Sequence, residues 1–418
     1  MIPAFDLYKE QFQVMSSDVI KPGLTAIEHA MEKLSNPHLD VPTVHVAGTN
    51  GKGSTIAMLE SICRTHGLKT LTFTSPCIED VHDQIKVNNE PLQPFQMNEI
   101  FTVLQEAQLS GELTDFELLT AAAFVACRLY KPDIAIIEAG LGGRFDSTNV
   151  VQPIVSIIPS IALEHTNFLG DTLEKIAWHK AGILKRHASG VIGELPEEAM
   201  NVVVEQARQV GMRLKIDGID FDVLPGENYV QGMLEITDLH RMLKGQHQMR
   251  NMGLAITAFL EVARNLSLTV KVPLIRQGVS KASVPGRFEQ ISQNVFLDGA
   301  HNPASAKMLK ETIAQQFQEA PVHIVMGILK DKDVAGVLRE LEEVCDDFVF
   351  VEVESEQQRL MPADALMEQS KATKTQVATN TLQAVLEKKK EPGFVIMTGS
   401  LYLLAQWRHD LLEAFKGQ

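Results

Sequence analysis

Short apolar runs rich in β-branched residues alternate with longer helix-like segments along almost the whole chain of 418 residues. Parallel neighbours in a sheet must be joined by a crossover, which is usually a helix, so this alternation favours a mainly parallel, helix-covered sheet. In the first half, the apolar runs predict strands at 43–47, 69–73, 134–138, 154–158 and 189–192. Periodic segments between them predict helices at 55–66, 96–108, 116–130, 172–179 and 197–210.

Two interruptions divide this pattern. Residues 213–240 contain short alternating pieces with turn signals, which predict a β-ribbon or a small antiparallel sheet before a helix at 249–265. The stretch 281–288 contains proline and glycine, and we expect it to be an interdomain linker. Beyond it the alternation resumes, with strands predicted at 294–298, 322–327, 347–353 and 394–397 and helices at 303–317, 333–344, 380–388 and from 401.

The chain is therefore expected to be an α/β protein of two domains, because its length exceeds one ordinary core. The N-terminal domain, 1–284, is predicted to contain a P-loop-type, mainly parallel sheet and the small β-ribbon. The smaller C-terminal domain, 285–418, is predicted to be a Rossmann-like α/β unit.

The charge balance narrows the range of partners. The chain has 53 acidic and 38 basic side chains, a formal charge of −15. Such a field disfavours nucleic acid and anionic membranes, so an anionic substrate must be held by local cations. No signal peptide is visible, and charges interrupt every apolar stretch before the ~18 residues of a membrane span. The four cysteines form no CxxC pair, so we expect a cytoplasmic protein with reduced thiols.

The strongest local signal is a glycine-rich segment between a predicted strand and a predicted helix. It consists of Gly48, Thr49, Asn50, Gly51, Lys52, Gly53, Ser54 and Thr55. Glycines allow backbone N–H groups to approach phosphate oxygens, the helix points its positive end at them, and Lys52 adds a charge. The Ser54 hydroxyl suits the shell of a Mg²⁺ ion. The strict Walker pattern is not matched, because an extra glycine separates Lys52 from Ser54, and the alternative is an ordinary glycine turn.

Three further side chains follow strand or helix ends in the first domain. Glu138 ends an apolar strand, where ligands and metals gather in parallel sheets, and its oxygens suit Mg²⁺. On the residues alone, Glu138 is equally well explained as a capping or turn residue. His165 and Lys180 follow two later transitions, but a lone histidine is more often structural and a lone lysine is usually solvated.

The second domain adds Arg287 in the linker and the sequence Asp298-Gly-Ala-His301-Asn302-Pro303 after a predicted strand. An aspartate at a strand end, with a histidine and an asparagine that open a helix, is consistent with a nucleotide or phosphate site. The alternative is a turn followed by a helix N-cap. If both halves close on one ATP, the linker is a hinge.

Ten motifs, in order from about residue 20 to the end, make the chain resemble the folylpolyglutamate synthase/dihydrofolate synthase family of the Mur-ligase superfamily. They are HVAGTNGKGST (45–55), TSP (74–76), IEAGLGGRFDSTNV (137–150), EHTNFLG (164–170), KAGI (180–183), GQHQMRN (245–251), PGRFE (285–289), LDGAHNP (297–303), GILKDKD (327–333) and TGSLYL (398–403). A single one of these motifs is a weak signal, and ten in the expected order are a strong one.

The resemblance implies a two-domain ligase that uses ATP and Mg²⁺ to join L-glutamate to a folate-type carboxylate. The carboxylate is first phosphorylated, and the amine of glutamate then attacks the acyl phosphate and expels phosphate. The implied substrate is a tetrahydrofolate, and dihydropteroate is a second one that the same site accepts in the family. A monomer whose partners are small molecules is expected.

Site residues are carried over position by position, as the resemblance implies. The phosphate loop falls on Gly48 to Thr55, with Lys52 on the phosphates. Metal ligands fall on Ser54, Ser75, Glu138 and His165, and catalytic roles on Lys52, Glu138, His165 and Lys180, of which the last is often carbamylated in the family. Further ATP-contacting positions fall on Asn251, near the adenine, and on Arg287, Asp298 and His301.

Several residues near these motifs depart from the family pattern. Cys77 replaces a histidine, Asp83-Gln84 replaces Glu-Arg, His179 replaces an acid and Val284 replaces a tryptophan. These changes bear on substrate choice and rate, not on the fold.

Other functions remain as alternatives. They are a Mur-type amide ligase on another carboxylate, a catalytically weak nucleotide- or folate-binding paralogue, and a P-loop ATPase or GTPase switch. The predicted second α/β domain disfavours the switch. The extra glycine and the missing N-terminal UDP-sugar domain disfavour a cell-wall precursor ligase.

Overall fold

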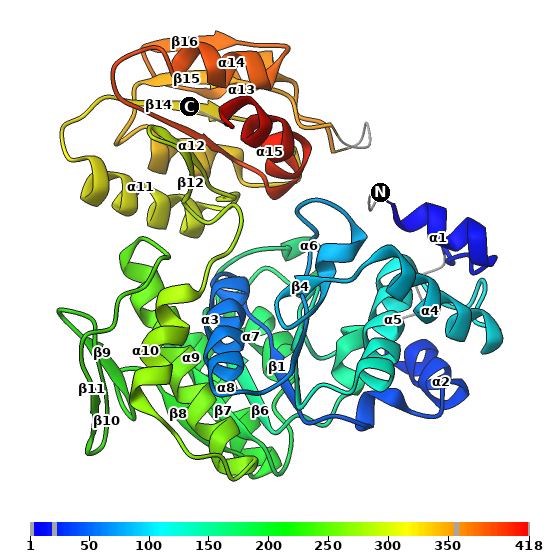
Figure 1. Cartoon of the computed structure of the whole chain (residues 1–418). Helices are drawn as coiled ribbons and strands as arrows, with labels where there is room; N and C mark the ends of the chain where they lie inside the picture. The colour runs from blue at the N-terminus through cyan, green and yellow to red at the C-terminus, as the bar shows by residue number, and fades with distance from the viewer. Residues whose placement is uncertain (1–3, 19–22, 355–358, 417–418) are drawn as a thin grey trace. The chain divides into compact units, whose positions relative to one another are not determined.

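A computed structural model describes residues 4–18, 23–354 and 359–416, and in it the chain forms two compact units (Figure 1). The first unit comprises the residues up to Met242 together with Met249–Ser283, and the second comprises Leu243–Gln248 and the residues from Val284 on. The assignment of domains to 1–284 and 285–418 stays a prediction. Within the described ranges, no helix has both the length and the apolar character needed to cross a bilayer.

The first unit contains an eight-stranded sheet in the order β4-β3-β2-β5-β1-β6-β7-β8. From β2 to β8 all neighbours are parallel, whereas β3 and β4 form an antiparallel edge. This confirms the predicted mainly parallel sheet. The strands are β1 Thr43–Val46, β2 Thr70–Phe73, β3 Ile85–Val87, β4 Glu90–Pro91, β5 Ile134–Glu138, β6 Val155–Ile158, β7 Ser189–Ile192 and β8 Arg213–Ile216.

Helices pack on this sheet in groups, because each presents an apolar stripe to it. One cluster joins α1, α2, α4 and α5 to β2 and β5, and another joins α7 and α8 to β6 and β7. Helix α3 lies so close to α10 that a Cβ at Gly278 would be 2.6 Å from Ile62 Cα. The helices are α1 Phe5–Phe12, α2 Thr25–Lys33, α3 Lys52–Thr65, α4 Pro94–Glu106, α5 Asp115–Tyr130, α6 Thr166–Leu169, α7 Leu173–Ala181, α8 Glu197–Val210, α9 Gln246–Asn265 and α10 Val272–Lys281, with 3₁₀ turns η1 Pro37–Leu39, η2 Val81–Gln84 and η3 Ser147–Val150.

The predicted β-ribbon is shorter than 213–240. An antiparallel three-stranded sheet, in the order β11-β10-β9, is formed by β9 Asp222–Leu224, β10 Asn228–Gln231 and β11 Leu234–Ile236. The first part of the predicted ribbon is instead β8, which extends the main sheet in parallel with β7. Helix α8 connects β7 to β8, and such a crossover makes the two strands parallel.

The second unit is an α/β sheet in the order β12-β13-β17-β14-β15-β16, in which only β12 is antiparallel to its neighbour. This confirms the predicted smaller α/β unit. Two separate apolar clusters join the sheet to α11, α12 and α13 and to α14 and α15. The elements are β12 Glu289–Ser292, β13 Val295–Leu297, α11 Pro303–Phe317, β14 Val322–Met326, α12 Val334–Leu341, β15 Asp347–Phe350, α13 Ala363–Gln369, β16 Lys374–Val377, α14 Thr381–Lys388, β17 Phe394–Thr398 and α15 Leu401–Phe415.

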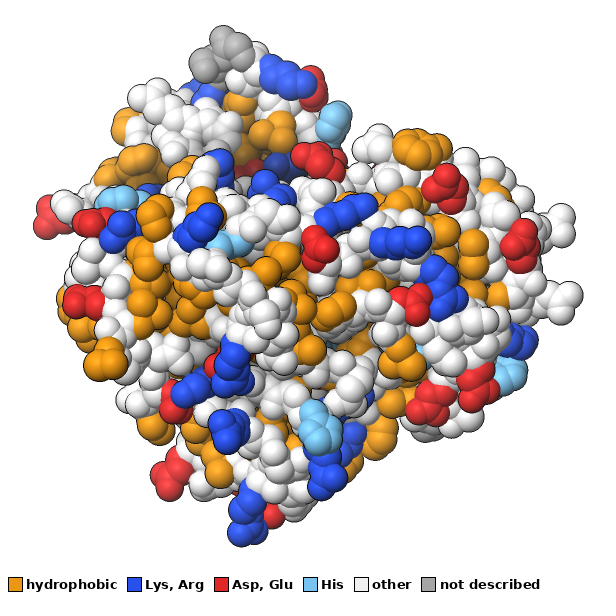
Figure 2. Space-filling model, turned by 60° about the horizontal axis from the view of Figure 1, so that its bottom comes forward, with side chains coloured by type: hydrophobic (Ala, Val, Ile, Leu, Met, Phe, Trp, Pro, Cys, Tyr) orange, Lys and Arg blue, Asp and Glu red, His pale blue; other side chains and the backbone are white. Residues whose placement is uncertain are grey.

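On the face that Figure 2 draws, Lys and Arg side chains are interspersed with Asp and Glu, and apolar side chains lie between them. The field around that face is therefore a mixture of both signs. Local side chains decide where an anion can bind.

Candidate active site

The predicted phosphate loop connects the end of β1 to the start of α3. Gly51 has a φ of +85° and caps the helix, which begins at Lys52, three residues before the predicted start. Glycine tolerates this φ without strain, so the helix axis can point its first N–H groups at the loop. The loop thus has the local geometry of an anion-binding turn.

Backbone and side-chain contacts with the segment after β6 hold the loop in shape. The N–H of Thr49 donates to the carbonyl of Ser160 (2.9 Å), and the N–H of Asn50 donates to Ser160 Oγ (2.9 Å). A Cβ at Gly48 would lie 3.0 Å from Pro159 Cδ, so a side chain there would push the two segments apart. The loop is therefore formed by the fold itself, before any ligand binds.

Three predicted site residues meet at the carboxyl edge of the sheet. Lys52 Nζ donates to the carbonyls of Gly48 (3.0 Å) and Thr49 (3.2 Å) and lies 3.7 Å from Glu138 Oε1. Glu138 is buried at the end of β5 and accepts the N–H of Ser75 (3.4 Å). A cation, a carboxylate and a serine thus lie beside the loop, as phosphoryl chemistry requires.

Asn251, on α9, packs against the same loop. A Cβ at Gly51 would lie 2.5 Å from Asn251 Oδ1, so the amide fills the space that a side chain at Gly51 would need. Asn251 is itself buried. The structure therefore brings this predicted residue to the loop, while its contact with an adenine stays a prediction.

Lys180 is buried in the last turn of α7. Burial, together with the charge of Lys52, lowers its pKa to about 7, and Glu164 and Asp146 oppose the shift. Near neutral pH both the amine and the ammonium form are populated, which is unusual for a lysine and typical of functional sites. The sequence pattern alone favoured a solvated lysine here, and only the family resemblance indicated a catalytic role for Lys180.

His165 lies at the N-cap of the short helix α6 with a φ of +51°. Its Nε2 is 3.9 Å from Glu164 Oε1, and its side chain is 39% exposed. A metal-ligand role for His165 stays a prediction. A nitrogen donor is also a softer ligand than the oxygens that Mg²⁺ prefers.

The glycine-rich loop after β5 lies against the end of α7. The N–H of Arg144 donates to the carbonyl of His179 (2.7 Å), and a Cβ at Gly143 would lie 3.0 Å from the same oxygen. The Arg144 guanidinium stacks on Trp178, with Cζ 4.1 Å from the ring centroid. Burial, with the Arg144 charge, lowers the pKa of His179, so this replacement for the family's acid is neutral at pH 7.

Asp83 and Gln84, which replace the family's Glu-Arg, contact the segment 74–79, which contains Ser75. Asp83 Oδ2 accepts the N–H groups of Ile78 (2.9 Å) and Glu79 (2.7 Å), and Gln84 is buried with its Nε2 3.5 Å from the Thr74 carbonyl. Burial, followed by the charges of Asp83 and Asp80, raises the pKa of Cys77 to about 12. The Cys77 thiol is therefore protonated at neutral pH and is a poor nucleophile.

The predicted residues of the second unit form a turn and a helix cap. Asp298 accepts the N–H of Phe288 through Oδ2 and of Ala300 through Oδ1, both at 2.9 Å. His301 Nδ1 lies 2.8 Å from the Gly299 carbonyl. Asn302 caps α11, whose Ser305 N–H donates to Asn302 Oδ1 (2.8 Å). These local roles exist beside the predicted ATP contacts of Arg287, Asp298 and His301, which stay predictions.

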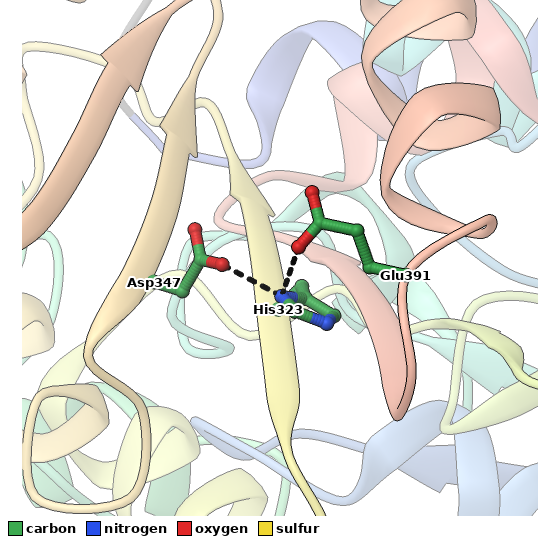
Figure 3. A group of neighbouring side chains, drawn as sticks. All are labelled: His323, Asp347 and Glu391. Carbon is green, nitrogen blue, oxygen red and sulfur yellow. Dashed lines mark hydrogen bonds and ion pairs between the residues drawn. The ribbon is translucent and has the colours of Figure 1, made fainter.

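A group with the spacing of metal ligands occurs in the second unit, formed by His323, Asp347 and Glu391 (Figure 3). His323 Nδ1 is 2.7 Å from Asp347 Oδ2, and its Nε2 is 3.1 Å from the Pro392 carbonyl. Lys388 Nζ lies 2.9 Å from both oxygens of Asp347 and 3.2 Å from Glu391 Oε1. Because the Lys388 ammonium group already forms ion pairs with both carboxylates, the group is a charge network of the fold.

Two acids near Lys180, Glu164 and Asp146, and the loop-holding Ser160 were not assigned from the sequence. Glu164 and Asp146 lie within recognised motifs, but nothing in their spacing relates them to Lys180. The fold brings them together because they follow different strands of one parallel sheet. Ser160 has no sequence signal beyond its place after a strand.

Comparison with known proteins agrees with this geometry. Residues 286–401 match the Mur ligase, glutamate ligase domain. The chain is 33% identical over 413 residues to the dihydrofolate synthase/folylpolyglutamate synthase of Bacillus subtilis, covering 94% of this chain and 95% of that protein. The structure of Escherichia coli FolC in complex with DHPP and ADP matches with a TM-score of 0.88 and 29% identity, over 98% of this chain and 97% of that chain.

A second solved structure is a bifunctional folylpolyglutamate synthase/dihydrofolate synthase with Mn, AMPPNP and L-glutamate bound. It matches with a TM-score of 0.85 and 28% identity, over 98% of this chain and 97% of that chain. Both the sequence and the structural similarity extend over nearly the whole length of each protein. The chain therefore belongs to the dihydrofolate synthase/folylpolyglutamate synthase family.

Proposed function

We propose that this protein is an ATP-dependent ligase that joins L-glutamate to a folate-type carboxylate by an amide bond. The observation that carries the proposal is the meeting of Lys52, Glu138 and Ser75 at a preformed phosphate loop. Full-length similarity to a dihydrofolate synthase/folylpolyglutamate synthase supports the choice of substrate class. Solved relatives that bind ADP with DHPP, or AMPPNP with L-glutamate, support it further.

The residues present fit ATP and Mg²⁺. Ser54, Ser75 and Glu138 offer oxygen donors, which Mg²⁺ prefers, and the left-handed Gly51 lets α3 begin with its N–H groups directed at the loop. The metal ion supplies charge neutralisation at the phosphoryl group that is transferred. Lys52 adds a cation at the loop, and Glu138 keeps that cation oriented toward the carboxyl edge of the sheet.

The reaction proceeds in two displacements. An oxygen of the folate-type carboxylate attacks the γ-phosphorus of ATP, forming an acyl phosphate and releasing ADP. The amine of L-glutamate then attacks the acyl carbon, loses a proton, and expels inorganic phosphate as the amide forms. Lys52 stabilises the charge that builds up on the phosphoryl oxygens in the first step.

Lys180 is proposed to act as a carbamate. Burial populates its neutral amine form near pH 7, and this amine adds to carbon dioxide and loses a proton. The resulting carbamate is an anion, in place of the ammonium cation that would otherwise lie near Lys52. His165 is proposed as a metal ligand. The proposed ATP contacts come from Asn251 in the domain 1–284 and from Arg287, Asp298 and His301 in the domain 285–418. A cytoplasmic monomer with small-molecule partners is the proposed form.

A paired ligation assay tests the proposal. Purified protein, MgATP and isotopically labelled glutamate are offered either dihydropteroate or a tetrahydrofolate monoglutamate, and the products are identified by mass. We expect labelled product with the tetrahydrofolate. Product with dihydropteroate as well means a bifunctional enzyme, and product with neither substrate refutes the proposal.

A further inference from the structure

A four-residue segment, Asp146 to Asn149, holds together parts of the first unit that carry site residues. We propose that His45 and Thr148 are positioning residues, which act through Asp146 to fix the loop 140–146 against the end of α7, where Lys180 lies. The inference rests on the proposed function, because the effect is read out in ligation. His45 and Thr148 are both fully buried, so they act on the site only through other residues.

His45, Thr148 and Asp146 are connected by a row of hydrogen bonds, and the direction of each bond can be assigned. Thr148 Oγ1 lies 2.5 Å from Asp146 Oδ1 and 2.9 Å from His45 Nε2. Every contact of the Asp146 carboxylate that the structure shows is with a donor, namely the N–H groups of Gly140, Leu141 and Thr148 and the Thr148 hydroxyl. Burial raises the pKa of Asp146, and these donors oppose that rise because they favour the charged form. Asp146 is therefore a carboxylate that accepts the Thr148 proton, and the Thr148 oxygen must accept the Nε2–H of His45.

The tautomer of His45 follows from this direction. Nε2 carries the proton, so Nδ1 is a bare acceptor, and it has no hydrogen-bond partner among the described residues. His45 is fully buried in the central strand β1, and burial, followed by the charge of Lys185, lowers its pKa to about 3. The ring therefore stays neutral and donates one hydrogen bond at any working pH.

Asp146 connects these hydrogen bonds to the loop 140–146 and fixes the position of that loop. Its carboxylate accepts the N–H of Leu141 (2.8 Å), and Leu141 lies three residues after Glu138. The loop then turns at Gly143, and the N–H of Arg144 reaches the His179 carbonyl (2.7 Å). A shift of the Asp146 carboxylate would move the connection between the Glu138 strand and the Lys180 helix.

The neighbours of Asp146 tie the same loop to further elements. Ser147 Oγ is 2.7 Å from Thr120 Oγ1 on α5. Asn149 Nδ2 donates to the carbonyls of Arg144 (3.0 Å) and Gly182 (3.2 Å), and Gly182 follows the last turn of α7. The segment therefore links β1, α5, the loop and α7, and the His45–Thr148–Asp146 chain is its buried, directional part.

The decisive variants differ in whether they keep the hydrogen bonds. Thr148→Val has nearly the shape of threonine but neither donates nor accepts, whereas Thr148→Ser keeps both roles. His45→Leu removes the donor, and His45→Gln can keep it. Thr257→Val is the matched control, because Thr257 is a buried threonine of the same unit whose hydroxyl bonds Tyr229 OH (2.8 Å) and the Gly253 carbonyl (2.8 Å).

We expect Thr148→Val to lower kcat for glutamate ligation about tenfold or more, a change of about 1.4 kcal/mol per factor of ten. KM for MgATP should stay within about twofold of the wild-type value. The reason is that Ser160 holds the phosphate loop, and the His45–Thr148–Asp146 hydrogen bonds do not. Thr148→Ser should keep most of the wild-type kcat, and Thr257→Val should change stability only. A uniform loss of activity in step with stability would indicate a merely structural role.

A Thr148→Val enzyme with wild-type kcat overturns the inference, as does a control variant with an equal loss. If Thr148→Val does not fold, His45→Leu and His45→Gln decide, since equal kcat values for these two variants also overturn it. An inactive wild type refutes the proposed function instead, so the two failures can be told apart.

Discussion

Two buried lysines, Lys180 in the first unit and Lys388 in the charge network of the second unit, have pKa values that are shifted in opposite directions. In the second unit, burial lowers the pKa of Lys388, but the hydrogen bonds that Lys388 donates to Asp347 and Glu391 outweigh this effect and raise the pKa above its ordinary value. In the first unit, burial and the Lys52 charge lower the pKa of Lys180 to about 7. Lys388 is paired and supports the fold, whereas the lowered pKa of Lys180 is consistent with the chemistry proposed for it.

The largest effect expected from this comparison is on Lys52. Lys52→Ala should lower ligation by about a thousandfold or more, because a cation at the transferring phosphoryl is lost. The variant should still fold, although the buried Glu138 loses a cation that lies 3.7 Å away. Product formation by mass and the thermal melt measure the two properties together. Near-normal turnover in this variant would refute the assignment of the phosphate loop.

The matched change in the second unit should have the reverse outcome. Lys388→Ala leaves Asp347 and Glu391 without their ammonium partner, which costs about 3 kcal/mol of unfolding free energy at this degree of burial. Urea titration measures that loss, and ligation per folded molecule should remain. If Lys388→Ala instead abolishes turnover without loss of stability, the network belongs to the reaction and the contrast between the two regions fails.

The pH dependence of stability separates the two lysines. The folded-state pKa of Lys180 lies below its unfolded value of about 10.4, so between pH 7 and pH 10 the unfolded chain binds more protons than the folded one. Stability contributed by this site therefore rises with pH, by at most about 1.4 kcal/mol per unit. Lys180→Met should unfold at higher urea than the wild type at pH 7, with a gap that narrows toward pH 10.

Buffers free of carbon dioxide keep carbamylation out of that measurement. Lys388→Met serves as the comparison, because a raised pKa gives no such slope below pH 10. A constant gap between wild type and Lys180→Met across the range would mean that Lys180 stays charged in the folded protein.

The sequence predicted best those elements whose ends are marked by specific residues. Strands β5 and β7 and helices α8 and α11 have the predicted bounds, because long apolar runs, prolines and an asparagine cap mark their ends. The edge strands β12 and β16 were missed, since exposed polar residues hide the period of two. Helix α3 begins earlier than predicted, because the left-handed Gly51 lets the turn start at Lys52.

For the site, the sequence indicates the local geometry where one segment holds all the residues, and it does not do so where the fold assembles them from several segments. The phosphate loop lies within eight consecutive residues, so its sequence and its geometry are nearly the same information. The surroundings of Lys180 come from Lys52, Glu164 and Asp146, which follow three different strands. Their distances depend on strand order, β5-β1-β6, which no local pattern specifies.

That strand order also bears on how the protein is made. Among the described residues, strand β1, which ends in the phosphate loop, pairs with β5 and β6, and both are synthesised long after it. A ribosome-bound chain that stops before β6 lacks Ser160 and half of the strand's hydrogen bonds, so it should have no affinity for nucleotide. Nucleotide binding by nascent chains of increasing length would therefore report the moment at which the central sheet closes.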